Sequence, residues 1–221
     1  MNKMKRLIKT TTLNKILKLA ENLLNDDQLN QINRAINQLT VNNRPKPLVN
    51  VYNEILNKAE CTYSNTVYRK ITFDLNDIVA LNNSYKISKD EVFNYIKNNL
   101  ETNSYQSCTK SLETCRNFEA DWFDFEVIIS FECSEGIDVM AICNKYLEIA
   151  KQRYKDVQSG NSESKYGLNK LRAIIRSYES IIGDFESEEE VLAMVPNDYQ
   201  IVEIVGIDMN DDILDLSVLA K

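Results

Sequence analysis

Apolar residues recur every three or four positions in two consecutive segments between residues 137 and 182. Such spacing places apolar side chains on one face of an α-helix. Because only the polar stretch 158–164 separates the segments, the second helix is expected to fold back on the first. The sequence therefore predicts an antiparallel helical hairpin over 137–183 with coiled-coil-like packing. The apolar positions are Met140, Cys143, Leu147, Ala150, Tyr154 and Val157, then Leu168, Leu171, Ile175, Tyr178 and Ile182.

A different periodicity precedes the hairpin. From Phe123 to Cys133 apolar residues alternate with other residues, which is typical of an antiparallel strand with one buried face. Phe125, Val127, Ile129 and Phe131 are expected to be buried, while the intervening acids face solvent or a partner. A similar alternation over 67–75 predicts a second strand.

The chain begins with helical patterns. Residues 1–60 are predicted to form a helical segment, with helices over about 13–24, from Asp26 or Asp27 to Leu39, and from Pro47 to about Ala59. Capping-box patterns at Ser88–Glu91 and Ser187–Glu190 predict two further short helices.

The C-terminal region is expected to be a β-hairpin. Residues 200–208 and 212–219 flank Asn210 and Asp211, which suit a tight turn. The predicted class is α+β, with a helical segment at 1–60 followed by an α+β domain at 61–221. This domain has a mainly antiparallel sheet, into which the helical hairpin is inserted before the C-terminal β-hairpin.

Composition argues against most catalytic chemistry. The 221 residues include no histidine, which removes the commonest general base and transition-metal ligand. The five cysteines have no Cys-x-x-Cys spacing, so we expect reduced thiols and no zinc site. No glycine-rich phosphate-binding motif can be assembled. We therefore expect no catalytic residues, no cofactor and no enzymatic activity.

A cluster of aspartates near the C-terminus is the nearest approach to a metal site. Asp208, Asp211, Asp212 and Asp215 could supply hard oxygen ligands for magnesium or calcium. However, Ile213 stands where a calcium-binding loop needs glycine, and Leu219 stands where it needs a closing glutamate. An acidic turn accounts for the pattern better, and no metal is predicted.

The two ends of the chain carry opposite charge. Six bases and one acid occur among residues 1–21, whereas the region from Asp184 to Asp215 is acidic without a base. Unlike ends attract when copies meet head to tail, within a screening length of about 8 Å at physiological salt. The candidate partner-binding residues are Lys3, Lys5, Arg6, Lys9, Glu188, Glu189, Asp211 and Asp212.

Each charged segment has alternative interpretations. The basic residues could contact nucleic acid, an acidic membrane surface or an acidic neighbour, or could lie on a solvated helix face. The acids at 186–190 could be favoured in the first turn of a helix by its dipole. Because the net charge is −7, nucleic-acid binding is not expected except through the basic N-terminus.

These patterns favour a protein of an assembly. We expect a non-enzymatic structural component, specifically a bacteriophage virion protein of the head, neck or tail, that binds other copies or other subunits. Abundant Asn, Lys, Ile and Tyr suggest AT-rich coding sequence, as in a phage or an AT-rich bacterium. The alternative is a small cytosolic binding protein that inhibits a host enzyme through its acidic surface. Neither a signal peptide nor a membrane span is predicted, so the expected location is the cytoplasm or the virion.

Overall fold

The structure is a computed structural model that describes residues 11–20, 27–39, 46–118, 125–161 and 167–220. The chain divides into two compact units. Unit 1 contains residues 1–64, 105–107 and 134–193, and unit 2 contains residues 65–104, 108–133 and 194–221. The chain first passes from unit 1 to unit 2 after residue 64, near the predicted boundary at residue 60. The helical hairpin, which was predicted with the second domain, belongs to unit 1.

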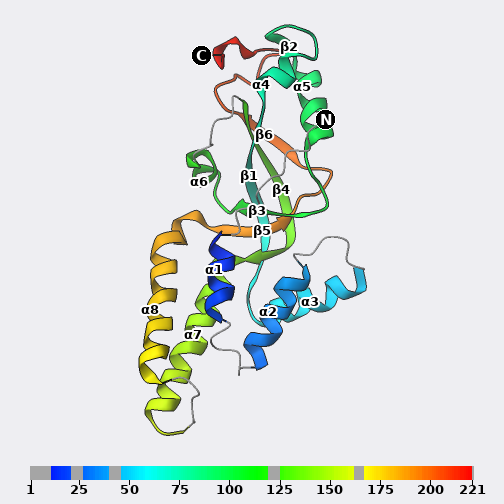
Figure 1. Cartoon of the computed structure of the whole chain (residues 1–221). Helices are drawn as coiled ribbons and strands as arrows, with labels where there is room; N and C mark the ends of the chain where they lie inside the picture. The colour runs from blue at the N-terminus through cyan, green and yellow to red at the C-terminus, as the bar shows by residue number, and fades with distance from the viewer. Residues whose placement is uncertain (1–10, 21–26, 40–45, 119–124, 162–166, 221) are drawn as a thin grey trace. The chain divides into compact units, whose positions relative to one another are not determined.

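Unit 1 is mainly helical. Its long helices α7 and α8 run side by side (Figure 1) and are joined through residues 159–167. The helix α1 packs against both of them, and α2 packs against α3. The helices are α1 (Thr11–Ala20), α2 (Asp27–Leu39), α3 (Lys46–Lys58), α7 (Val139–Gln158), α8 (Leu168–Phe185) and the 3₁₀ turn η2 (Glu186–Glu188).

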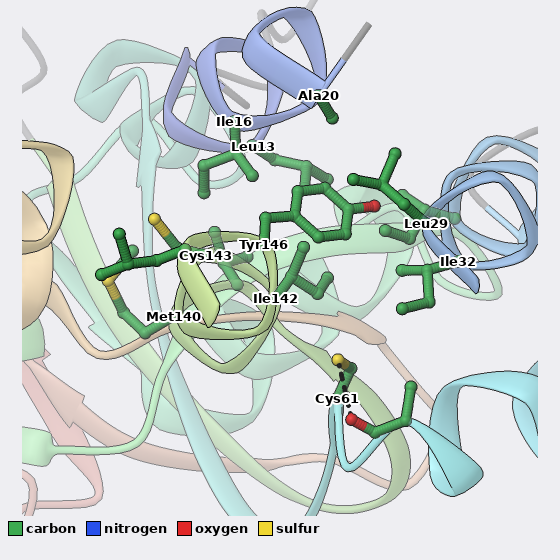
Figure 2. Close-up of a cluster of buried hydrophobic side chains, with 14 of the residues drawn as sticks. Leu13, Ile16, Ala20, Leu29, Ile32, Cys61, Met140, Ile142, Cys143 and Tyr146 are labelled. Carbon is green, nitrogen blue, oxygen red and sulfur yellow. Dashed lines mark hydrogen bonds between the residues drawn. The ribbon is translucent and has the colours of Figure 1, made fainter. Parts of the chain in front are cut away.

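The core of unit 1 surrounds Tyr146, which is fully buried. Its ring projects from α7 between side chains of α1 and α2 (Figure 2). It meets the ring of Tyr178 edge-on, with the centroids 6.3 Å apart, and its hydroxyl donates to Asn33 Oδ1. Ile16 and Leu29 are also fully buried, and burying such a side chain contributes about 1.5–3 kcal/mol. The apolar faces predicted for α1, α2, α7 and α8 therefore meet in one core.

Unit 2 contains shorter elements. Phe73, Phe125 and Tyr95 form an aromatic group, in which the Phe73 ring lies 5.7 Å from Tyr95 and 6.4 Å from Phe125. The elements outside the large sheet are α4 (Leu75–Val79), β2 (Lys86–Ser88), α5 (Lys89–Asn99), α6 (Leu112–Asn117), β7 (Ile213–Asp215) and the 3₁₀ turn η3 (Leu216–Val218).

The large sheet has the strand order β1-β3-β5-β4-β6, with a further β1–β4 pairing. The described pairs β1–β3, β4–β5 and β4–β6 are antiparallel. Four of the strands, β1, β3, β4 and β5, contribute residues to both units. The strands are β1 (Thr62–Phe73), β3 (Tyr105–Thr109), β4 (Phe125–Asp138), β5 (Glu190–Met194) and β6 (Gln200–Ile204).

The α+β class, the mainly antiparallel sheet and the helical hairpin are confirmed. The hairpin spans residues 139–185, because Ile137 pairs with Leu192 in the sheet instead of starting the helix. Asp138 then caps α7 by accepting a hydrogen bond from the Ala141 N–H (3.0 Å). The capping box at Ser88 is also confirmed, since Ser88 Oγ accepts from the Glu91 N–H and Glu91 accepts from the Ser88 N–H.

The predicted C-terminal β-hairpin is wrong. The strand β6 pairs with β4, whereas β7 pairs with β2 in a separate two-stranded sheet. Along β4, Val127 and Ile129 lie opposite Ile204 and Ile201. These cross-strand apolar pairs stabilise the pairing of β6 with β4.

The helix predicted from Ser187 is also wrong. After η2, Glu189 adopts a left-handed conformation (φ 49°), and residues 190–194 form the strand β5. Val191, Leu192 and Ala193 are buried there. Burial within a sheet outweighs a capping signal of about 1 kcal/mol.

One-sided burial of the central strand is wrong as well. Phe125, Val127, Ile129 and Phe131 are buried as predicted, but Ile128 and Ser130 on the other face are buried too. Glu126 is half-buried and Glu132 is exposed, while residues 123 and 124 lie outside the described residues. Both faces of β4 are therefore covered over part of its length.

Candidate functional site

The predicted partner-binding residues that the structure describes lie in two turns, one in each unit. Lys3, Lys5, Arg6 and Lys9 lie outside the described residues. Glu188 and Glu189 share a turn of unit 1, and Asp211 and Asp212 share a turn of unit 2. The candidate site therefore consists of two acidic turns, one in each unit.

The first is the unit 1 acidic turn, residues 184–190, at the end of α8. Asp184 and Glu186 are exposed there. The C-terminus of a helix carries partial negative charge, so acids at this end are unfavourable by about 0.3–1 kcal/mol each. No base occupies the last turn of α8 to offset them. This end of α8 therefore attracts positive charge.

A base of the N-terminal helix meets this turn. The Lys15 ammonium lies 4.7 Å from the centre of the Phe185 ring, where its charge is attracted to the π-face. Burial raises the pKa of the Glu188 carboxyl, and the positive charge of Lys15 partly opposes that rise. The opposed charges of the two ends therefore meet, in part, within one chain. Lys15 is one of the six bases among residues 1–21, but the charge pattern gave no reason to place it in a site.

Glu190 is a buried carboxyl that sequence reasoning missed. Only 6% of the residue is exposed, and its Oε1 accepts a hydrogen bond from the Ser107 hydroxyl (2.8 Å). Burial raises the pKa of Glu190, the Ser107 hydrogen bond lowers it, and the nearby charge of Glu188 raises it further. Buried carboxyls with shifted pKa values occur often at functional sites, but they also occur in structural networks. The capping-box pattern concealed it, because that pattern predicted Glu190 on an exposed helix turn.

This shift predicts a pH-dependent stability. An unperturbed glutamate titrates at 4.5, whereas Glu190 retains its proton to a higher pH in the folded state. Between these two pKa values the folded state binds more protons, so the free energy of unfolding attributable to this group falls as pH rises. Glu190→Gln cannot titrate, so the variant is expected to gain stability relative to the wild type as pH rises from 4.5 toward the raised pKa of Glu190.

Urea unfolding at several pH values measures this difference. The matched control is Glu186→Gln, an exposed glutamate of the same turn, which is expected to follow the wild type. Parallel pH profiles for the wild type and Glu190→Gln would contradict the assigned shift.

The second is the unit 2 acidic turn, residues 208–212. The Asn210 backbone N–H (2.9 Å) and side-chain amide (2.8 Å) both donate to Asp208 Oδ1. The Lys89 N–H donates to the Asp212 carbonyl (2.8 Å), and the Lys89 ammonium donates to the Met209 carbonyl. The backbone of the turn is therefore tied to α5, while the Asp211 and Asp212 side chains are exposed.

Neither Asp211 nor Asp212 forms a salt bridge within the described part of the chain. In that same part, no group of three or more His, Cys, Asp or Glu residues is arranged to hold a metal ion. What this turn offers chemically is uncompensated negative charge on an ordered backbone.

Comparison with known proteins finds no matching family model, no matching curated protein and no matching solved structure.

The five cysteines are all buried, and none of them forms a disulfide. Burial raises the pKa of the Cys61 and Cys143 thiols to about 12 and that of Cys115 to about 11. Because the thiolate is the nucleophile, these three thiols are poorly reactive at neutral pH. Cys61 instead donates to the Ala59 carbonyl (Figure 2).

None of the helices among the described residues has the length and apolar character needed to span a membrane.

Proposed function

We propose that this chain is a non-enzymatic structural component of a protein assembly, and that the assembly is a bacteriophage virion. The assembly role rests on one observation. The exposed Asp211 and Asp212 have no basic partner within the described residues, while the chain supplies a basic segment from Lys3 to Lys9. The virion is proposed from the coding bias toward Asn, Lys, Ile and Tyr.

The two acidic turns differ in how far a nearby base compensates their negative charge. In unit 1, Lys15 already lies beside the acidic turn and offsets part of its charge. In unit 2, Lys89 holds the turn by donating from its ammonium to a backbone carbonyl and not to the carboxylates. The unit 2 acidic turn is therefore the more available partner for a basic segment.

Charge alone cannot hold such an assembly together. An exposed ion pair contributes about 0–1 kcal/mol, so several must act together and apolar contacts must supply most of the affinity. Large hydrophobic side chains are available for this purpose, since Val51, Leu81, Ile213 and Val218 are each about half exposed. Electrostatics would then set the rate and orientation of association.

Self-association that weakens with salt is the expected result. In sedimentation velocity the wild-type chain should form larger species at low ionic strength, and these should dissociate as salt rises without unfolding of the subunit. The triple variant Lys5→Glu, Arg6→Glu, Lys9→Glu should associate less at every salt concentration.

The matched control reverses two lysines and one arginine at exposed positions elsewhere: Lys97→Glu, Lys155→Glu, Arg176→Glu. This control has the same net charge as the test variant, so it separates the effect of position from that of total charge. Native mass measurement of the protein from its source material gives an independent test. A chain that is monomeric there and at every salt concentration would contradict the proposal and favour the alternative of a small inhibitor.

A further inference from the structure

The two-stranded sheet of unit 2 has one covered and one uncovered face. Its antiparallel register pairs Lys86 with Asp215, Ile87 with Leu214, and Ser88 with Ile213. Successive side chains of a strand point to opposite faces, so Ile87 and Leu214 share one face. Both of these residues are buried. The opposite face, formed by Lys86, Ser88, Ile213 and Asp215, is called the outer face below.

Ile213 gives the outer face its apolar character. It is 54% exposed, more than any other large hydrophobic side chain that the structure describes. The buried pair on the inner face already attaches this small sheet to its unit, so folding does not require isoleucine at position 213. A two-stranded sheet is marginally stable alone, and a partner that covered Ile213 would stabilise it.

Exposed apolar side chains also flank this sheet. Tyr85 precedes β2 and is 41% exposed, and its carbonyl accepts a hydrogen bond from the Leu216 N–H (2.8 Å). Val218 follows in η3 and is 51% exposed. Exposed apolar residues concentrated in one part of a surface are typical of interaction sites.

Negative charge adjoins the outer face. Asp211 and Asp212 directly precede Ile213, and the hydrogen bond from the Lys89 N–H to Asp212 holds this junction in place. Asp215 lies opposite Lys86 in the sheet. Hydrogen bonds from Ser217 are the main cause that lowers the pKa of Asp215, and the positive charge of Lys86 lowers it further. Lys86 thus compensates Asp215, whereas Asp211 and Asp212 remain without a salt bridge among the described residues.

We propose that the outer face binds the basic N-terminal segment of a second copy of this chain. That segment, residues 3–9, reads Lys-Met-Lys-Arg-Leu-Ile-Lys, so it combines four positive charges with three apolar side chains. The combination complements Asp211 and Asp212 in charge and Ile213 in apolar surface. The proposal rests on the proposed function, because it identifies the contact through which copies assemble.

A charge-exchange experiment tests this contact with the full-length chain. The face variant is Asp211→Lys, Asp212→Lys, and the segment variant is Lys5→Glu, Arg6→Glu, Lys9→Glu. Alone, each variant places like charges opposite each other, so its self-association in sedimentation velocity should weaken about tenfold or more. Mixed together, the variants present unlike charges in both directions, and association should recover toward that of the wild type.

Two further variants make the test specific. Ile213→Ser should weaken association while leaving the circular dichroism spectrum unchanged. Glu113→Lys, Asp198→Lys introduces the same charge change at exposed positions of unit 2 and should associate like the wild type.

The outcomes separate this proposal from the proposed function. A wild-type chain that does not self-associate refutes both. A wild-type chain that associates, together with a face variant that associates equally well, refutes only the outer face as the contact. Failure of the mixed variants to recover also refutes it, and indicates that the basic segment binds its own chain or another partner.

Discussion

Replacing Phe125 with alanine is expected to destabilise unit 2 by about 3–5 kcal/mol, the usual cost of removing a buried aromatic ring. Phe125 has no exposed surface, and its ring lies 6.4 Å from that of Phe73. Phe125 is the first residue of β4, which pairs with β6 and has buried side chains on both of its faces in this region. Removing the ring loses its buried apolar surface and leaves a cavity that partial relaxation does not fill. Urea unfolding followed by circular dichroism measures the loss.

The chain offers a matched control for Phe125. Phe118 belongs to the same unit and is 37% exposed, so Phe118→Ala should cost well under the loss at Phe125. Its backbone carbonyl accepts a hydrogen bond from the Lys70 ammonium (2.8 Å), and alanine retains this carbonyl. Equal destabilisation by the two substitutions would contradict the buried position of Phe125.

Truncating Tyr146 to alanine should have a comparable effect on unit 1, about 3–5 kcal/mol, because it removes a fully buried ring from the centre of the core. Tyr146→Phe keeps the ring and its edge-on contact with Tyr178 and removes only the hydroxyl that donates to Asn33. Since Asn33 is half-buried and can be reached by water, this variant should lose only about 1 kcal/mol.

The pair of substitutions separates the contribution of the ring from that of the hydrogen bond. Hydrogen exchange of amides in α7 and α8, compared with amides in β6, reports whether the loss is confined to unit 1. A larger loss for Tyr146→Phe than expected, close to that for alanine, would show that the hydrogen bond to Asn33 and not the ring stabilises this core.

The contrast between the two capping boxes shows where sequence reasoning succeeds. The side chains of Ser88 and Glu91 each accept a hydrogen bond from the other residue's backbone N–H. The two residues are only three positions apart, so the helix that follows could be predicted from local chemistry alone. Ser187 has the same pattern, yet the chain there turns at Glu189 and enters the sheet as β5. The gain from burying Val191 and Leu192 depends on strands that are distant in sequence, and no local pattern reports it.

Sequence reasoning likewise identified part of the candidate site and missed the contacts that depend on the fold. The charge pattern alone directed attention to Glu188, Glu189, Asp211 and Asp212. It could not show that Glu190 is buried against Ser107, because that contact joins residues 83 positions apart. Nor could it show that Lys15 reaches Phe185, or that Ile213 is left uncovered beside Asp212.

The sequence by itself determined the α+β class, the helical hairpin, the apolar faces of its helices and the opposed charge of the chain ends. These follow from periodicity and from contacts between near neighbours in the chain. Only the tertiary structure decided that β6 pairs with β4 and β7 with β2, that both faces of β4 are buried, and that the acids are divided between two turns. The physical reason is that a strand satisfies its backbone with any partner of suitable register, so the choice of partner depends on the burial that the whole fold provides.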